Sequence, residues 1–333
     1  MKIAYGLTNH IPAFRDQTPR QIADRLRAMG CDGVFLKHLR HDWVDGLRAA
    51  GLAVYVSQPV FLATDDLWTR FPNSRPVLPD GSPAPVQEWY RPALPTDDGL
   101  RAYRLAQLAE TLTALPVDGV WLDFIRWPAR WEAPALHLYH SSFDERTVGR
   151  FAAETGHAIP VYLSTPEIAH LLLHELTDDW LAWRSRQIAS FVEEARSLVD
   201  RLRPGARLGL FTVPWTGDEG LDHTGMEQAH IRIVGQDPAL LGPLADVLSP
   251  MVYHRLCGRD PAWPGQVTAR LAAQVPCAVW PIVEALPDDA GYSRAEFARA
   301  LSSAGQAGGE GVIVFKVEGL LADAGKVEAW RGG

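Results

Sequence analysis

The chain has 333 residues, of which 47% are hydrophobic and 22% are charged, and its formal net charge is −8 at pH 7. This composition is typical of a globular protein and excludes a disordered or fibrous one. No run of Lys and Arg dominates any segment, which disfavours a nucleic-acid partner, because phosphate binding needs a clustered basic surface. No apolar run approaches the roughly 20 residues that a membrane span requires.

The three cysteines, Cys31, Cys257 and Cys277, form no Cys-x-x-Cys pair, so neither a zinc site nor a redox motif is indicated. Their odd number fits a reducing compartment without a disulfide framework. The N-terminus enters a strand pattern directly, without the features of a signal peptide. We therefore expect a cytoplasmic protein, and the sequence implies no cofactor and defines no oligomeric state.

Eight short apolar runs alternate with helical patterns, which is typical of parallel strands buried on both faces. The predicted strands cover residues 3–7, 33–37, 53–57, 119–125, 208–213, 247–253, 278–283 and 311–317. The predicted helices cover residues 18–29, 40–50, 97–115, 179–203, 265–274 and 293–304, the first with Thr18 as N-cap and Pro19 as its first helical residue. The pattern predicts an α/β fold, a single-domain (β/α)8 TIM barrel over residues 1–333, with an open doubly wound sheet as the alternative.

Two connections are long, residues 58–96 after the third strand and residues 126–177 after the fourth. The second contains a predicted helix with Ser142 as N-cap and Glu145 at N3, and Gly156 ends it. Because both insertions follow strands, we expect them on the C-terminal face of the barrel, where active sites of this fold are built.

Asp123 is the strongest functional candidate among the polar residues at strand ends. It interrupts an apolar strand, and a buried carboxylate needs a partner or a function. Alternation along the strand puts Trp121 and Asp123 on the same face, toward the inside of the barrel. Arg126 is close enough in sequence to be a partner, so a structural Asp–Arg pair is the alternative to catalysis. The strand-end candidates are Asn9, His10, Lys37, His38, Gln58, Asp123, Arg126, Trp215, Tyr253, His254, Glu284, Lys316 and Glu318.

Glu284, at the end of the seventh strand, is the second catalytic candidate. Glycosidic cleavage usually takes two carboxyl groups that flank the bond. The fourth and seventh strands lie across the barrel from each other, so we expect Asp123 and Glu284 to face one cleft. The alternative for Glu284 is a solvated loop carboxylate.

The sequence contains twelve tryptophans, and aromatic rings pack on the C–H faces of sugars as well as in cores. Trp89, Trp127, Trp131 and Trp215 are candidate stacking platforms, with ordinary packing as the alternative for each.

Lys37, Gln58, Tyr253, His254 and Lys316 are further candidates for contacts with the substrate. A structural role is the alternative for His254, and a Schiff base is an alternative for Lys316. The histidines do not predict a metal site, because the chain has no His-x-His in its first strand and no His-Glu-x-x-His motif. The glycines of residues 305–311 precede the eighth strand and so lie on the opposite face.

Residues 118–128, Asp-Gly-Val-Trp-Leu-Asp-Phe-Ile-Arg-Trp-Pro, resemble the fourth-strand signature of glycoside-hydrolase-like (β/α)8 barrels. Residues 180–188 resemble the Trp-Arg helix that follows this strand in those families, and residues 249–253 resemble their sixth-strand motif. The resemblance implies that Asp123 is the catalytic aspartate and that Arg126, Trp183, Arg184 and Tyr253 line the site. Chitinase-like barrels are similar but have further acids at positions 121 and 125, so chitinase chemistry is not expected and the proton donor stays unassigned.

Three functions follow from these features. The first is hydrolysis of an O-glycosidic bond in an oligosaccharide or glycoconjugate, with Asp123 and Glu284 as acid/base and nucleophile in either order. The second is a non-catalytic carbohydrate-binding barrel, and the third is a lyase or aldolase that uses Lys316.

Overall fold

The computed structural model describes residues 1–8, 10–37, 40–86, 88–131, 138–215, 228–285 and 291–332. Their strands form one parallel sheet with the order β7-β6-β5-β4-β3-β2-β1-β9-β8. All eight predicted strands are present, and the seventh is divided in two. The strands are β1 (Lys2–Leu7), β2 (Gly33–Leu36), β3 (Ala53–Pro59), β4 (Gly119–Asp123), β5 (Arg207–Thr212), β6 (Val247–Pro250), β7 (Ala278–Val279), β8 (Ile282–Glu284) and β9 (Val312–Phe315).

The sheet closes into a barrel through the segment that carries β7 and β8. These strands lie at opposite edges of the sheet order, yet they are consecutive pieces of the chain, separated by Trp280 and Pro281. The Trp280 N–H donates to the Leu248 carbonyl of β6 at 2.9 Å, and the Ile313 N–H of β9 donates to the Pro281 carbonyl at 2.9 Å. One segment therefore joins both edges, and the predicted (β/α)8 barrel is confirmed.

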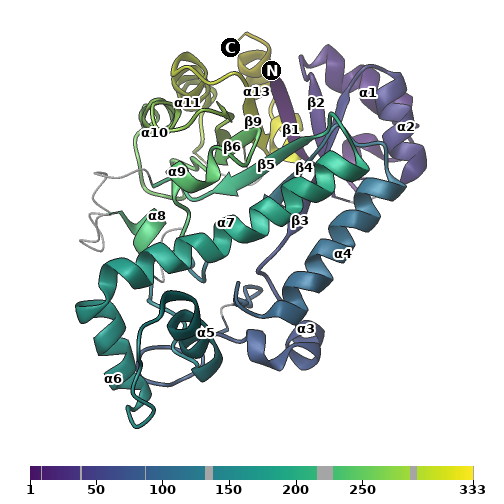
Figure 1. Ribbon diagram of the computed structural model, residues 1–333. Coiled ribbons are helices and arrows are strands. Elements are labelled where there is room, and N and C mark those ends of the chain that lie inside the picture. The colour runs from purple at the N-terminus through teal and green to yellow at the C-terminus, as the bar shows by residue number, and fades with distance from the viewer. Residues whose placement is uncertain are drawn as a thin grey trace.

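Helices cover the outside of the barrel, and the long helix α7 runs beside α4 (Figure 1). The predicted first cap is confirmed, since the Thr18 side chain accepts the Gln21 N–H and Gln21 completes a capping box. Short 3₁₀ turns cover Pro12–Phe14 and Pro72–Ser74, and a π turn covers Leu171–Glu175. The α-helices are α1 (Pro19–Ala28), α2 (His41–Ala49), α3 (Asp65–Arg70), α4 (Asp98–Ala114), α5 (Glu145–Thr155), α6 (Thr165–His170), α7 (Thr177–Leu202), α8 (Ala229–Arg232), α9 (Pro238–Leu241), α10 (Trp263–Ala272), α11 (Arg294–Gln306), α12 (Val317–Leu321) and α13 (Ala324–Gly332).

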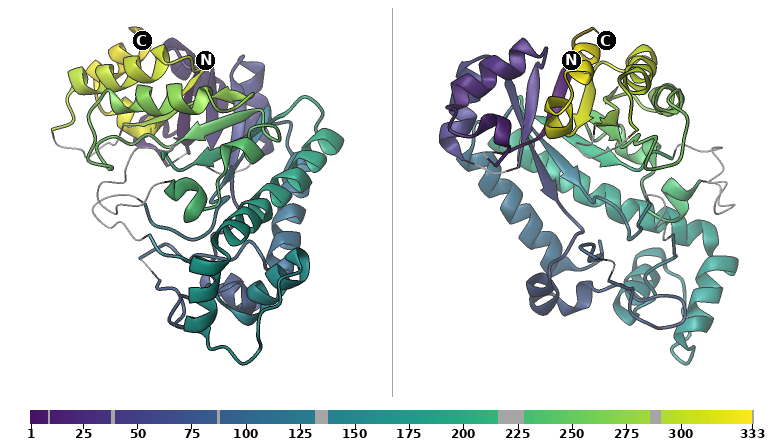
Figure 2. Two further views of the ribbon diagram at one scale, coloured as in Figure 1. Left: turned by 60° about the vertical axis from the view of Figure 1, so that its left-hand side comes forward. Right: turned by 180° about the vertical axis from the view of Figure 1, so that it is seen from behind.

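The two chain ends lie side by side, and α3, α5 and α6 of the two insertions gather at the opposite end of the molecule (Figure 2). The Met1 ammonium donates to the Glu310 carbonyl at 2.8 Å, and Lys2 Nζ donates to the Trp330 carbonyl at 2.5 Å. Because β1 begins at Lys2, the insertions lie toward the C-terminal ends of the strands. In the described part of the chain, no helix is both long and apolar enough to cross a membrane.

Helix α5 begins two residues later than its sequence predicts. Asp144, not Ser142, is the N-cap, and its side chain accepts the Thr147 N–H at 2.9 Å. The Ser142 hydroxyl instead accepts the Val77 N–H at 2.9 Å, so the first insertion uses the side chain that the local pattern assigned to the cap. The predicted end is confirmed, since Gly156 adopts the left-handed conformation that suits glycine.

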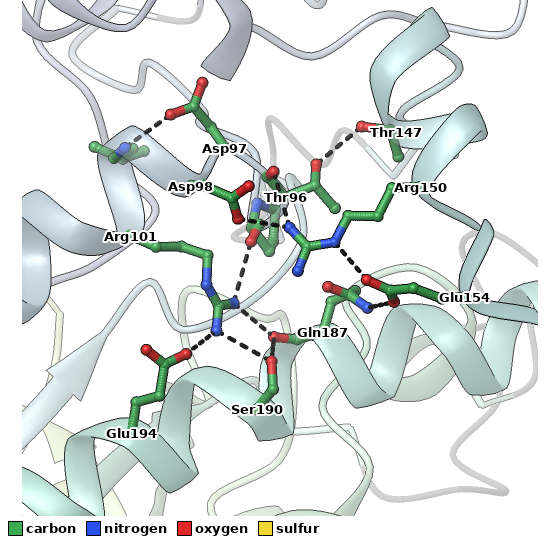
Figure 3. A network of polar contacts seen from close by, with 12 residues as sticks. Thr96, Asp97, Asp98, Arg101, Thr147, Arg150, Glu154, Gln187, Ser190 and Glu194 are labelled. Atoms are coloured by element: carbon green, nitrogen blue, oxygen red, sulfur yellow. Dashed lines mark hydrogen bonds and ion pairs between the residues drawn. The ribbon is translucent and has the colours of Figure 1, made fainter. Parts of the chain in front are cut away.

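Arg150 of α5 joins the second insertion to the barrel helices (Figure 3). Its guanidinium lies 2.7 Å from the Asp98 carboxylate of α4 and 2.7 Å from Glu154 of its own helix. Glu154 also accepts the Trp183 indole N–H at 2.7 Å and the Gln187 amide at 2.8 Å, both from α7. Trp183 and Gln187, which lie in the Trp-Arg helix motif, therefore serve here to hold α5 against α7.

Arg101 fixes α4 to α7 in the same network (Figure 3). Its buried guanidinium donates to the Pro95 and Gln187 carbonyls at 3.2 and 3.1 Å and to the Ser190 hydroxyl at 3.1 Å, and it pairs with Glu194. Hydrogen bonds to a charged donor are stronger than neutral ones, so this cluster keeps the insertions at a defined position over the strand ends.

Large aromatic side chains fill the inside of the barrel and face glycines of neighbouring strands. Trp121 of β4 is fully buried, and its ring centroid lies 5.0 Å from that of Tyr55 and 5.5 Å from that of Trp280. Its indole N–H donates to the Ser249 hydroxyl of β6 at 2.9 Å. A Cβ added to Gly209 of β5 would lie 2.0 Å from the indole, so only glycine leaves room for Trp121.

Gly209→Ala is expected to lower the free energy of unfolding by about 3 kcal/mol or more, because the new methyl group overlaps a ring packed on all sides. The matched control is Gly149→Ala, since Gly149 lies within α5 and an added Cβ there meets nothing within 4 Å. The control should raise the free energy of unfolding by about 0.5–1 kcal/mol. Urea unfolding measures the free energy of unfolding of both variants. A value for Gly209→Ala equal to that of the wild type would contradict the packing of Trp121 on β5.

Candidate active site

Asp123 ends β4 and lies on the same face of the strand as the buried Trp121, as predicted. Its side chain is partly exposed, and its Oδ1 accepts the Phe124 N–H at 2.8 Å. Phe124 has a φ of +52°, which is unfavourable for a residue with a side chain and concentrates at functional sites. The strand therefore ends in a sharp turn directly after a carboxylate that solvent can reach.

Tyr5 of β1 and Asp123 of β4 lie close enough across the barrel to interact electrostatically. β2 and β3 separate β1 from β4 in the sheet, so the two side chains can influence each other only through the interior. Burial raises the pKa of the Tyr5 phenol far above its usual 10.0, the Asp123 charge raises it further, and a hydrogen bond with Ser57 acts in the opposite direction. The phenol thus stays protonated at neutral pH.

Trp89 and two neighbours form an aromatic rim beside Asp123. Among the tryptophans that the structure describes, Trp89 alone is exposed, at 56%. Its ring centroid lies 6.0 Å from that of Phe124, and Tyr90 stacks on Phe124 at 5.9 Å. Because Phe124 is the residue after Asp123, the exposed indole lies near the end of β4 that carries the candidate carboxylate.

Trp131, Trp215 and Tyr253 form a second aromatic cluster, which is buried. The Trp131 ring stacks on Tyr253 at a centroid distance of 5.8 Å and meets Trp215 edge-on at 6.4 Å. Tyr253 also contacts Phe315 of β9 at 5.2 Å. These rings belong to the packed interior of the barrel, with exposures of 2% to 6% for the first three.

Glu284 is fully buried, so it is not the solvated loop carboxylate that was the alternative. Its Oε1 accepts the Arg255 N–H at 2.5 Å and lies 3.4 Å from His254 Nδ1. His254 Nε2 lies 3.2 Å from Glu296, which also pairs with the Arg255 guanidinium at 3.0 Å. Burial lowers the pKa of His254 although Glu296 acts to raise it. Glu284 is thus the inner member of a network that fixes its orientation.

Lys37 and Lys316 approach each other over Gly6 of β1. A Cβ added to Gly6 would lie 3.8 Å from Lys37 Cε and 3.7 Å from Lys316 Cβ. Lys37 is exposed and Lys316 is partly exposed, with its ammonium 5.7 Å from the centroid of the Phe315 ring. These two candidates are therefore brought together at the strand ends.

Arg126 does not pair with Asp123, contrary to our expectation. Its buried guanidinium donates to the Ala129 carbonyl at 2.6 Å and lies 5.3 Å from the centroid of the Phe124 ring. In the part of the chain that the structure describes, no ion pair joins Arg126 and Asp123. The turn at Phe124 redirects the backbone, so Arg126 supports the aromatic rim instead of the carboxylate.

Trp127, Arg184 and Gln58 point away from Asp123. The Arg184 guanidinium lies 4.5 Å from the centroid of the Trp127 ring and donates to the Ile233 carbonyl at 2.8 Å, and both side chains are fully buried. Gln58 donates to the Arg104 carbonyl of α4 at 2.8 Å. The three side chains hold the elements around the site together, in positions that do not reach the barrel interior.

Of the four remaining strand-end candidates, two lie outside the described residues and two are at least partly exposed. Asn9 and His38 lie outside the described residues. His10 is exposed, and Glu318 is partly exposed in α12. Sequence reasoning missed Tyr5 and Ser57, although strand alternation from Ile3 would have placed the Tyr5 hydroxyl inside the barrel near the end of β1.

Gln236 and His230 line a small cavity behind Trp215. The Gln236 side chain accepts the Val213 N–H at 2.9 Å and donates to the Ile125 carbonyl at 3.2 Å, which ties the chain after β4 to the chain after β5. His230 is 5% exposed, and burial lowers its pKa to about 4. The wall behind the site therefore contains a histidine that stays neutral at neutral pH.

No protein-family profile and no curated protein sequence matches the chain. Its fold is nevertheless shared with solved glycoside hydrolases. The PgaB (BpsB) glycoside hydrolase domain from Bordetella bronchiseptica has a TM-score of 0.71 at 14% identity, over 99% of this chain and 97% of that one. A β-galactosidase from the psychrophilic Marinomonas ef1 has a TM-score of 0.67 at 14% identity, over 99% of this chain and 58% of that one.

α-L-Fucosidase isoenzyme 2 from Paenibacillus thiaminolyticus is also similar, with a TM-score of 0.55 at 13% identity over 99% of this chain and 48% of that one. The chain thus spans little more than half of the β-galactosidase and about half of the fucosidase. At such identities the likeness establishes the fold, which is that of glycoside-hydrolase barrels, and fold alone does not dictate function.

The free energy of unfolding is expected to fall as the pH drops from 6.5 to 4. In this window the unfolded chain binds a proton at His230 that the folded protein, with its pKa of about 4, does not. The slope is up to about 1.4 kcal/mol per pH unit for one histidine. His230→Gln should flatten the dependence in part, because burial also lowers the pKa of His140 to about 4.

The control is His41→Gln, which changes an exposed histidine of α2 and should leave the slope as in the wild type. Urea unfolding at a series of pH values measures it. A His230→Gln slope equal to that of the wild type would contradict a buried, neutral His230.

Proposed function

We propose that the protein is a glycoside hydrolase that cleaves an O-glycosidic bond in an oligosaccharide or glycoconjugate at the C-terminal mouth of the barrel. The observation that carries the proposal is the partly exposed Asp123 carboxylate on the inner face of β4. In this fold, catalytic groups occur at the C-terminal ends of the strands. Two structural neighbours, a glycoside hydrolase domain and a β-galactosidase, support the proposal.

Asp123 and Glu284 are the proposed pair of carboxyl groups. In this chemistry one group protonates the glycosidic oxygen as the bond from the anomeric carbon breaks, and the other attacks that carbon or activates water. Glu284 accepts a backbone N–H and faces an imidazole nitrogen, contacts that favour a charged carboxylate. We therefore assign the anionic role to Glu284 and the proton to Asp123, which reaches solvent and so the leaving group.

Trp89 is the proposed sugar platform. Its indole is exposed, aromatic rings of this kind can pack on the C–H face of a sugar, and this one lies against the residue that follows Asp123. Trp131, Trp215 and Tyr253 are buried, so in this proposal they shape the inner wall, and only their edges would meet a bound sugar.

A non-catalytic carbohydrate-binding barrel is the second candidate, and one observation favours it. Glu284 is fully buried and held by Arg255 and His254, which is also how a purely structural carboxylate would be held. In that case the rim around Trp89 binds sugar while no second carboxyl group takes part in a reaction.

Asp123→Asn is expected to lower kcat/KM by about 10²- to 10⁴-fold for aryl glycosides with poor leaving groups, because the proton donor is lost. Activated dinitrophenyl glycosides need no proton and should be much less affected. Glu284→Gln should abolish turnover of both kinds of substrate. A panel of α- and β-linked nitrophenyl and dinitrophenyl glycosides, followed by absorbance, makes these measurements.

The matched control is Asp200→Asn, which removes a carboxylate that is 65% exposed on α7 and should leave kcat/KM unchanged. Equal losses for both leaving groups in Asp123→Asn would contradict its role as the acid. If the wild type binds sugars but hydrolyses none of these glycosides, the carbohydrate-binding function is supported and the hydrolase function is contradicted.

A further inference from the structure

We propose that Lys37 and Lys316 together bind an anionic group on the sugar, so that the protein acts on an acidic saccharide, one that carries a carboxylate or sulfate. The part of this proposal that concerns turnover rests on the glycosidase function proposed above. The part that concerns binding stands on the two lysines alone, and it would hold for a binding barrel as well.

The strand order brings the two lysines to one place. β1 lies between β2 and β9, and Tyr5 of β1 is in register with Phe35 of β2 and with Phe315 of β9. Lys37 and Lys316 follow these two phenylalanines by two residues and one residue. Both side chains therefore leave the barrel just beyond the level of Tyr5, the residue that interacts electrostatically with Asp123.

Gly6 makes room for this approach. It has a φ of +92°, and β1 shows an irregular register between Tyr5 and Leu7. Lys37 Cε lies 3.8 Å, and Lys316 Cγ 3.9 Å, from the position where a Gly6 Cβ would stand. The two side chains thus touch the same small patch of β1 from either side, and their flexible ends can reach a common ligand.

No carboxylate among the residues that the structure describes pairs with this patch. In the described residues neither Lys37 nor Lys316 forms an ion pair, and the aromatic contact of Lys316 with Phe315 is weak compensation at 5.7 Å. Like charges that approach each other repel. An anion bound between them removes the repulsion, which is a physical reason for affinity at this point.

The use of lysine here is selective. Only four of the 32 Lys and Arg residues in the chain are lysines. The other two are structural, since Lys2 donates to the Trp330 carbonyl, and Lys326 is 4% exposed with its ammonium 4.5 Å from the centroid of the Tyr292 ring. A lysine ammonium is a compact charge on a flexible stem, which suits an anionic substituent whose position changes as a glycosidic bond is cleaved.

The arrangement separates two kinds of charge across the barrel mouth. Asp123 lies on the β4 side, whereas the lysines lie on either side of β1. A sugar that spans this distance would place its anionic substituent on the lysines and its scissile bond near Asp123. A substrate bound in the reverse direction would bring its anionic substituent near the Asp123 carboxylate, and the two negative charges would repel each other. The lysine pair therefore also sets the direction in which the sugar binds.

The test compares matched neutral and acidic substrates. Nitrophenyl glucosides, glucuronides and glucoside 6-sulfates in both anomeric forms are assayed with the wild type, Lys37→Met, Lys316→Met and the double variant. The wild type should prefer an acidic form by at least about tenfold in kcat/KM, which is 1.4 kcal/mol. The double variant should lose this preference, and the choice between glucuronide and sulfate identifies the anion.

Binding is measured separately from turnover, by calorimetric titration of Asp123→Asn with sodium glucuronate, glucose 6-sulfate and glucose. Binding of an anion that the two Lys→Met changes abolish supports the lysine site even if the wild type hydrolyses nothing, in which case only the glycosidase function fails. Raising the salt concentration should weaken such binding.

The matched control is Arg201→Met, which removes one exposed positive charge from the last turn of α7, at the opposite end of the barrel. It should leave the preference for acidic substrates unchanged, and urea unfolding should show that all variants are folded. A wild type that prefers the neutral substrate, or binds glucose as tightly as either anion, overturns the proposal. Equal losses for neutral and acidic substrates in the lysine variants also overturn it.

Discussion

Trp121 fills the barrel interior immediately below Asp123, and this packing decides which side chains a ligand can reach. The indole is in contact with the aromatic rings of Tyr55 and Trp280, and its N–H donates to the Ser249 hydroxyl of β6. It has space only because β5 carries Gly209. Among the residues that the structure describes, close packing of these rings fills the interior at this level. A substrate therefore meets only the groups at and above Asp123.

Above that floor, charge is distributed unevenly around the mouth. The carboxylate of Asp123 lies on one side, the protonated Tyr5 lies across the barrel from it, and the lysines stand beyond Tyr5 on either side of β1. Glu284 is buried and held in its orientation by the Arg255 N–H. In the proposed function, Asp123 protonates the leaving oxygen, and the two lysines orient an acidic sugar. The remote network of Arg101 and Arg150 fixes the insertions around them.

The eight strands could be predicted because a parallel strand covered on both sides must be apolar almost throughout, and the helix over residues 97–115 was placed to within one residue because its cap and apolar pattern are local. The predictions that failed depended on distant contacts. Ser142 looks like a cap until Val77 of the other insertion takes its hydroxyl. Arg126 looks like a partner of Asp123 until the left-handed turn at Phe124 redirects the backbone.

In the candidate site too, features set by the local sequence could be predicted, whereas features set by distant contacts could not. Asp123 could be found from sequence, because a charge within an apolar strand is visible there. Tyr5 could not be singled out, since an aromatic residue in a strand is unremarkable until the barrel closes and brings β1 opposite β4. The burial of Glu284 likewise follows from His254 and Arg255, which only the fold brings to the same place.

A crystal structure of Asp123→Asn in complex with the aryl glycoside that the wild type cleaves best is the most direct test of this account. We expect the glycosidic oxygen within hydrogen-bond distance of the residue 123 amide, about 3 Å, with the sugar resting on the Trp121 floor. A glycoside bound elsewhere, with residue 123 turned away from it, would contradict the assignment of this carboxylate to catalysis.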